Sequence, residues 1–285
     1  MIAERMKVVA VDIELLTRTY FYFDLPVPYE VENGTIQITP VNLCQSEIFL
    51  GSKSILSIDK NLFPDPKIIQ MSYLRFICEV LIPEDPTNVQ RFLNILLMCL
   101  GLKSPEIVFI DGDETNLAIR DKQLGIVINS KQFDDIKRII LYQNIPHYDD
   151  SYINPELQKA MEEEDELKNK HMVIPSLERK MAIITSHSGV LKTEQQKMTY
   201  RAHCALFDEV CGETEFTTIR PVMMFSKEGA NMEHWIYKKK KGKYDNYITD
   251  VDKYSQNIGG NGAIKTASST SSGDLYMQQI ENFNK

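Results

Sequence analysis

The strongest constraint on the fold is a change in the spacing of apolar residues, from every second position near the N-terminus to every third or fourth position further on. The segment Leu25 to Val41 alternates around Asn33-Gly34, a pair that tolerates the positive φ angles of a type I′ turn. This pattern predicts a β-hairpin patch. Residues 68–81 then carry apolar side chains at helical spacing, which predicts one amphipathic helix.

The middle of the chain predicts a very apolar helix followed by a small sheet. Asp85 is placed to cap a helix that starts at Pro86 and ends near Gly101. Its segment 92–100 is apolar almost all round, which is typical of a helix in a core or against a partner. Three short apolar runs in 106–128 predict a β-meander, and Ser130 is expected to cap the next amphipathic helix.

The C-terminal half is expected to be helical. A polar, aromatic stretch at 144–155 is interpreted as a linker, and a strongly charged helix follows it to about Lys168. One helix is predicted to begin after Pro175-Ser176 and end at Gly189, and the next to run from Thr193 to Gly212. A last apolar stretch, 216–225, is expected to be helical on either side of a break at Pro221.

These elements predict an α+β fold, mostly helical, with a helical C-terminal domain and a flexible C-terminal arm. The tract after Tyr254 is rich in Gly, Ser, Thr and Asn and cannot bury enough apolar surface to order itself. We predict an α+β domain at 1–146, a helical domain at 147–254 and an arm at 255–285.

The composition narrows the function classes. A chain of 285 residues with 43% hydrophobic residues can bury a core without a metal or disulfide. A net charge of -8 argues against a general binder of nucleic acid or anionic membranes, because both are negative themselves. Five cysteines without a C-x-x-C pair fit neither a disulfide framework nor a zinc finger.

No targeting or spanning segment is expected. Acidic residues interrupt the N-terminal stretch, which argues against a signal peptide. No stretch approaches the roughly 20 uncharged apolar residues that cross a bilayer. We therefore expect cytoplasmic synthesis and no membrane partner.

The sharpest catalytic candidate is the segment "IVFIDGDET", which places Asp111 and Asp113 after an apolar strand. It resembles the first motif of haloacid-dehalogenase-type phosphotransferases, and that resemblance implies a nucleophilic Asp111, a general acid Asp113 and a bound Mg²⁺. That family needs a parallel strand and a crossover helix, whereas "NLAIR" is expected to return at once as a hairpin. We therefore predict a non-enzymatic protein without a cofactor.

Other polar clusters give weaker signals. The five histidines lack the spacing that puts two metal ligands on one helix face, so no metal site is predicted. The basic cluster Lys238 to Lys243 has tyrosines nearby that could stack on bases. Asp245, Asp250 and Asp252 follow it, so a solvated or protein-docking patch is favoured over nucleic acid.

The candidate binding residues lie near the C-terminus. The arm ends in a short apolar motif at helical spacing, the layout of a tethered docking peptide. Further upstream, Trp235 and Tyr237 precede the lysine cluster. The predicted protein-docking residues are Leu275, Tyr276, Met277, Ile280, Phe283, Trp235 and Tyr237.

Several stretches are similar to tail-assembly chaperones and tail or baseplate morphogenesis proteins of tailed bacteriophages. They are "LPVPYEV", "IQITPVN", "SILSIDKN" with "IIQMSYL", "INSKQFDDIKRIILYQN", "YDDSYINPEL" and "MEHWIYKKKKGKY". The resemblance implies a non-enzymatic protein that holds or joins other tail or baseplate proteins. The C-terminal arm has no counterpart in it and would equally suit a structural subunit locked into a ring, so a homo-oligomer stays open. It implies the host cytoplasm as the location and leaves incorporation into the virion open.

Overall fold

The computed structural model describes residues 11–110, 116–150, 155–170, 175–223 and 236. Contacts divide the chain into one compact unit, Met1–Met232, and a second, Glu233–Lys285, of which only Ile236 is described. The first unit is α+β, as predicted. The predicted division at residues 146 and 254 stays a prediction.

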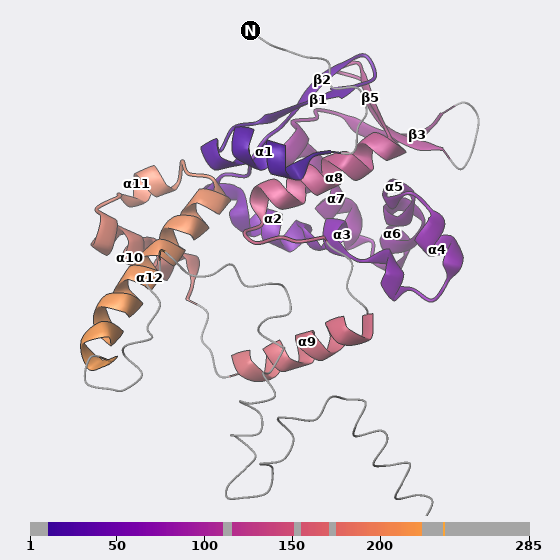
Figure 1. The fold of residues 1–285 in the computed structure, drawn as a ribbon. Helices are drawn as coiled ribbons and strands as arrows, with labels where there is room; N and C mark the ends of the chain where they lie inside the picture. Colours follow the sequence, from indigo (N-terminus) through magenta and orange to yellow (C-terminus); the bar gives the residue numbers. More distant parts are fainter. Residues whose placement is uncertain (1–10, 111–115, 151–154, 171–174, 224–235, 237–285) are drawn as a thin grey trace, which may run out of the picture. The chain divides into compact units, whose positions relative to one another are not determined.

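The N-terminal half of the first unit alternates short helices with two small sheets (Figure 1). Its elements are α1 (Ile13–Thr19), η1 (Phe21–Phe23), β1 (Val27–Val31), β2 (Gly34–Ile38), η2 (Leu43–Gln45), α2 (Ser46–Ser52), α3 (Ser54–Ser57), η3 (Lys60–Leu62), α4 (Pro66–Gln70), α5 (Tyr73–Phe76), the π-helix η4 (Ile77–Leu81), α6 (Ile82–Glu84), α7 (Thr87–Leu100), β3 (Pro105–Phe109), β4 (Leu117–Asp121), β5 (Ile126–Asn129) and α8 (Ser130–Asn144). The remaining helices are α9 (Pro155–Asn169), α10 (Leu177–Ser188), α11 (Lys192–Gln195) and α12 (Tyr200–Met223).

The predicted hairpin is confirmed, but its turn is one residue earlier than expected. Val31 pairs with Gly34, so Glu32 and Asn33 form the loop. Only Asn33 has a positive φ, of 67°, whereas a type I′ turn needs two such residues. Gly34 serves another purpose, because a Cβ there would lie 3.2 Å from Cγ2 of Ile126. The glycine thus lets the hairpin approach β5 closely.

The predicted helix over 68–81 is wrong in its continuity. The chain breaks after α4, and Ser72 starts α5 by accepting a hydrogen bond from the Arg75 backbone N–H. The predicted helix from Pro86 to Gly101 is confirmed as α7, which ends at Gly101 with a φ of 62°. Phe92, Ile95 and Leu96 are buried, so most of this apolar helix is core.

The predicted meander is confirmed as an antiparallel sheet in the order β3-β4-β5. The following helix begins one residue earlier than predicted. Asn129, not Ser130, caps α8 and exchanges hydrogen bonds with Gln132 in a capping box. The Ser130 hydroxyl instead donates to the Leu117 carbonyl at 2.6 Å.

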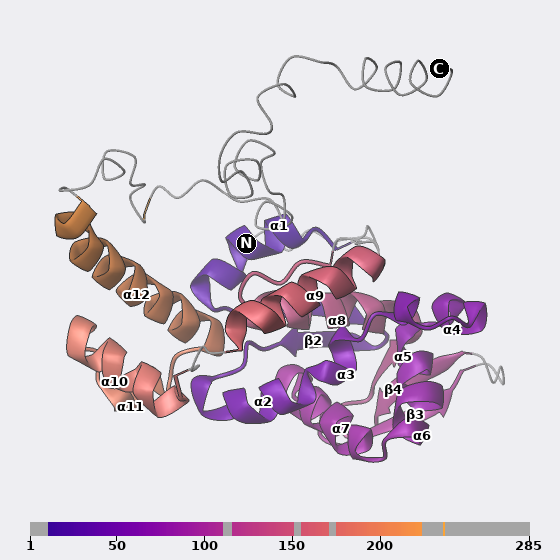
Figure 2. The same ribbon diagram turned by 90° about the horizontal axis from the view of Figure 1, so that it is seen from below.

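Helix α8 occupies the centre of the first unit, among the hairpin, the meander and the helices α1, α3, α5 and α12 (Figures 1 and 2). Its core side chains Phe133, Ile136 and Ile140 are fully buried. They join a single apolar cluster that draws on both sheets and on α7. The apolar positions predicted for residues 131–143 are therefore the side of α8 that is buried in the core.

The C-terminal helices match the sequence predictions in part. The charged helix is present as α9, and Ser176 and Gly189 bound α10 as expected. The helix predicted from Thr193 to Gly212 is wrong at both ends. A short α11 contains Thr193, whereas α12 starts at Tyr200 and continues through Gly212. The break predicted at Pro221 is wrong too, because α12 runs past this proline to Met223. No helix among the described residues is long and apolar enough to cross a membrane.

Candidate functional site

The binding residues predicted from the sequence lie outside the described residues. This holds for Trp235, Tyr237 and the terminal motif of Leu275, Tyr276, Met277, Ile280 and Phe283. It holds also for the lysine cluster Lys238 to Lys243 and for Asp111 and Asp113. The strand before Asp111 is β3, and it runs antiparallel to β4 as the sequence indicated, rather than in a parallel sheet.

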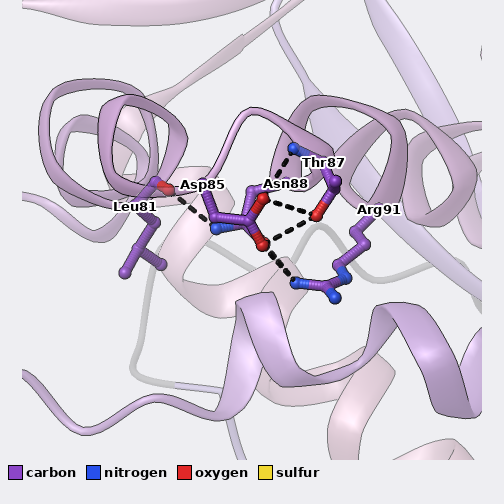
Figure 3. A network of polar contacts seen from close by, with 5 residues as sticks. All are labelled: Leu81, Asp85, Thr87, Asn88 and Arg91. Carbon is purple, nitrogen blue, oxygen red and sulfur yellow. Dashed lines mark hydrogen bonds and ion pairs between the residues drawn. The ribbon is translucent and has the colours of Figure 1, made fainter.

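A polar network joins the end of η4 and Asp85, which follows α6, to the first turns of α7 (Figure 3). The Asp85 carboxylate accepts hydrogen bonds from the Thr87 backbone N–H at 2.9 Å and from the Thr87 hydroxyl at 2.7 Å. Arg91 donates to Asp85 at 3.2 Å and to the Asn88 side chain at 2.8 Å, and Asn88 donates to the Leu81 carbonyl at 2.7 Å.

Every one of these contacts serves the junction between two helices. The hydrogen bonds from Thr87 and the charge of Arg91 lower the pKa of Asp85. Asn88 satisfies a carbonyl at the end of the π-helix η4, and Asp85 satisfies a free N–H at the start of α7. Each hydrogen bond of the network therefore serves a helix end, and the side chains of Arg91 and Asp85 stay 40% and 44% exposed.

A second polar cluster lies on α8, where the Lys137 ammonium sits 3.5 Å from the centroid of the Tyr73 ring. Burial lowers the pKa of Lys137 to about 8, although the charge of Asp134 opposes the shift. The Tyr73 hydroxyl donates to the carbonyls of Ile55 and Ile58 at 3.1 and 3.0 Å. The Tyr73 hydroxyl is thus bound to the protein itself, and the contact of Lys137 with the Tyr73 ring is a cation–π contact within the fold.

Metal chemistry finds no support in the described part of the chain. No group of three or more His, Cys, Asp or Glu side chains there could hold a metal ion. Asp121, the most buried carboxylate, accepts four backbone hydrogen bonds, from Lys103, Ser104, Gln123 and Leu124. Its oxygens are thus occupied by the protein itself.

The surface feature that has the character of a binding site is a short turn, residues Tyr20–Leu25, which we call the aromatic turn. Four consecutive aromatic residues run through it. Phe21 is 2% exposed and anchors the turn, whereas Tyr22 and Phe23 are 67% and 66% exposed. Leu15 and Leu25, at 44% and 47%, add apolar surface on either side in sequence.

Side chains from distant parts of the chain hold the base of this turn. Asp24 has a φ of 55°, a left-handed conformation that is strained for residues other than glycine. Its carboxylate accepts a hydrogen bond from the Thr199 hydroxyl at 2.6 Å. The next carbonyl, of Leu25, accepts from Gln143 of α8 at 3.1 Å. The turn is therefore fixed on its inner side.

Arg201 of α12 also supports the turn. Its guanidinium carbon lies 5.6 Å from the centroid of the Phe21 ring, and it donates to the Tyr142 carbonyl at 2.8 Å. Burial lowers the pKa of Arg201, while Asp24 acts in the opposite direction. The Arg201 side chain, which belongs to α12, thus contacts both α8 and the buried Phe21 ring.

The sequence predictions missed this site, although its signal was present. The run Tyr20, Phe21, Tyr22, Phe23 ends at an aspartate before Leu25-Pro26. Consecutive residues in a tight turn point in different directions, so they cannot all reach one core. At least one aromatic side chain had to remain on the surface, but which one depends on contacts with residues 143, 199 and 201.

Comparisons with known proteins give no relative on which to base a function. No family model matches the chain, and neither the curated proteins nor the solved structures include a significant match.

Proposed function

We propose that this protein works without catalysis, by binding other proteins, as a tail or baseplate morphogenesis protein or virion structural protein of a tailed bacteriophage. The aromatic turn is the surface that carries the proposal. Two neighbouring aromatic side chains, each two-thirds exposed, project from a fixed backbone there. The phage context comes from the resemblance of sequence segments between Leu25 and Tyr247.

The residue types suit a protein interface. Aromatic residues are enriched in the centres of protein interfaces, where a few of them carry most of the binding energy. Tyr22 and Phe23 offer large apolar faces, and Leu15 and Leu25, nearby in sequence, are exposed as well. A partner that covers these side chains gains the free energy of removing them from water.

The rigidity of the turn supports the same proposal. Ordering a flexible loop at an interface costs free energy, and a preformed loop avoids that cost. Here Thr199 holds the Asp24 carboxylate, Gln143 the Leu25 carbonyl and Arg201 the Phe21 ring before any partner arrives. The strained φ of Asp24 is kept by these contacts, as is common at functional sites.

Co-purification with tail and baseplate subunits tests the proposal. We expect Tyr22→Ala/Phe23→Ala to lower affinity for the partner by about tenfold or more, since truncating an interfacial aromatic anchor costs about 2 kcal/mol. Ile48→Ala on α2 is the matched control, because Ile48 is an equally apolar residue that is 53% exposed. Unchanged capture by the double variant, or the same loss in the control, would contradict the role of the turn.

The C-terminal residues call for a separate arm of the same experiment. Truncation after Gly259 removes the motif that ends in Phe283, and Trp235→Ala/Tyr237→Ala removes the two upstream aromatics. Loss of capture in either variant adds a second docking element to the aromatic turn. Full capture by both would show that neither C-terminal element is needed for binding.

Two alternative functions, a phosphatase and an accessory protein for nucleic acid, can each be tested by a direct assay. A Mg²⁺-dependent phosphatase activity that is lost in Asp111→Asn would replace the proposal with the haloacid-dehalogenase alternative. Salt-dependent binding of nucleic acid that is lost when Lys238 to Lys243 are replaced would favour an accessory protein for nucleic acid. We expect neither result.

A further inference from the structure

The two edges of the three-stranded sheet are treated differently by the rest of the protein. The outer edge of β5 is covered, because the Val127 N–H donates to the Glu32 carbonyl of the hairpin at 3.3 Å. The Asn129 N–H, on the same edge, donates to the Gln132 side chain at 3.0 Å. The opposite edge of the sheet is β3, and no described strand lies beyond it.

The hydrogen-bond pattern identifies which groups of β3 point outward. The Ile110 N–H donates to the Asn116 carbonyl, so Ile110 and every second residue before it face β4. The alternate residues, Pro105, Ile107 and Phe109, therefore direct their backbone groups to the free edge. Proline has no N–H, so this edge offers the amide groups of Ile107 and Phe109 and the carbonyl groups of all three residues.

The side chains next to this edge are apolar and uncovered. Ile107 lies opposite Ile119, and Ile119 lies opposite Ile128, so the three share one face of the sheet. Ile119 and Ile128 are fully buried, whereas Ile107 and Phe109 are 40% and 59% exposed. The apolar face of the sheet thus continues past the core onto a strand that no described element covers.

The sequence of β3 is complementary to itself in one antiparallel register. When Ile107 faces Ile107 of a second copy, Pro105 faces Phe109, and every pair on the apolar face is apolar. The two Ile107 residues exchange two backbone hydrogen bonds. Each Phe109 N–H donates to the Pro105 carbonyl of the other copy, and Pro105 has no N–H to donate in return.

The charge distribution along β3 also favours pairing with a second copy of the chain. Glu106 is the one charged residue of β3, and it forms an ion pair with Lys122 of its own chain at 2.9 Å. In the symmetric register Glu106 faces Val108 of the second copy, so no like charges oppose each other. An uncapped edge of this kind is a template for pairing with another strand.

We propose that β3 is a homodimer interface, in which two copies of the chain pair their β3 strands antiparallel about Ile107 and continue the sheet across the dimer. This interface is separate from the aromatic turn and does not rest on the proposed function. The contact of two five-residue strands is small compared with a standard interface of about 1,600 Å². The dimer is therefore expected to form reversibly with rising protein concentration.

Sedimentation of the purified chain over a concentration series tests the proposal without any phage subunit. We expect the wild type to shift from monomer to dimer, and Ile107→Lys to remain monomeric, because a lysine on the edge opposes strand pairing. Ile48→Lys, which changes an exposed isoleucine on α2, is the control and should dimerise like the wild type. A wild type that stays monomeric throughout, or an Ile107→Lys variant that dimerises equally, would overturn the proposal.

Cysteine crosslinking tests the register. In a background with the exposed Cys44 and Cys211 replaced by serine, Ile107→Cys should form a disulfide-linked dimer, because paired Cα atoms lie about 5.5 Å apart. Phe109→Cys is the matched control, since its counterpart in the second copy lies about 14 Å away along the strand in this register. Equal crosslinking of both variants, or none of Ile107→Cys, would rule out the register. Unchanged circular dichroism of each variant confirms that the comparison is between folded chains.

Discussion

One row of isoleucines crosses the three-stranded sheet, and its two ends have opposite environments. Ile128, at the β5 end, is fully buried under the rest of the first unit, whereas Ile107, at the β3 end, is 40% exposed. The strands have similar apolar sequences, so their composition does not explain the difference. What differs is the hairpin, which covers the β5 edge, whereas no described strand lies beyond β3.

Truncation along this row gives the largest expected contrast. Ile128→Ala should lower the free energy of unfolding by about 2–5 kcal/mol, since it leaves a cavity in the core. Ile107→Ala should cost about 1 kcal/mol or less, because much of that side chain already faces water. Denaturant unfolding of the dilute, monomeric protein measures both values. Equal losses would mean that β3 is covered after all.

Asp121 is expected to have the next largest effect, because it holds β3 in place without burying it. Its carboxylate accepts from Lys103 and Ser104, just before β3, and from Gln123 and Leu124 in the following turn. Asp121→Asn places an amide against donors of the same kind, and we expect a loss of about 1–3 kcal/mol. Thermal or denaturant unfolding at neutral pH measures it.

The same residue gives a pH dependence whose sign is fixed. Burial raises the pKa of Asp121, but the four backbone N–H groups outweigh it, and the net shift is downward. A carboxyl with a lowered pKa in the folded state stabilises the protein above its unfolded pKa of about 4, and this contribution is lost as the pH falls further. The difference between wild type and Asp121→Asn should therefore shrink below pH of about 4. A constant difference down to acidic pH would contradict this role.

A smaller effect is expected at the covered edge, where Gly34 lets the hairpin approach β5. A valine at this position would press on Ile126, whose Cγ2 already lies 3.2 Å from the position of a Cβ. We expect Gly34→Val to cost about 1–3 kcal/mol through overpacking, partly offset by the better strand propensity of valine. Gly51→Ala is the control, because nothing lies within 4 Å of its added Cβ and the helix should gain stability. Greater stability of Gly34→Val would show that the two edges are not joined closely.

The smallest effect on stability is expected for the two exposed aromatic residues of the aromatic turn, which lie directly after the buried Phe21. Tyr22→Ala/Phe23→Ala should change the free energy of unfolding by about 0.5 kcal/mol or less, because both side chains are two-thirds exposed. Phe21→Ala, at a buried position, should cost about 3–5 kcal/mol. A large loss in the double variant would mean that these two aromatics serve the fold rather than a partner.

Local patterns predicted the elements of the fold well where the deciding contacts are close in sequence. The hairpin, the meander, α7 with its Gly101 terminus and α10 between Ser176 and Gly189 follow from spacing and caps. Errors arise where two signals compete. Asn129 and Ser130 both suit a cap, and the Ser130 hydroxyl is drawn to the Leu117 carbonyl. Gly212 does not end α12, because a glycine inside a helix costs only about 1 kcal/mol.

The candidate site was less accessible to sequence reasoning, since exposure is set by distant residues. Thr199 lies 175 positions from Asp24, and Gln143 lies 118 positions from Leu25. No local pattern shows that these residues will hold a turn and leave Tyr22 and Phe23 outside. The edge of β3, beyond which no described strand lies, is equally hard to predict, because the hairpin that covers the other edge is about 90 residues earlier in the chain.

Amide hydrogen exchange with and without tail or baseplate subunits tests most directly whether the protein acts through the aromatic turn. We predict that a bound subunit slows exchange in residues 20–25 and leaves the buried core strands β4 and β5 unchanged. Slowed exchange confined to other surfaces, or no change with any subunit at saturating concentration, would contradict the proposed function.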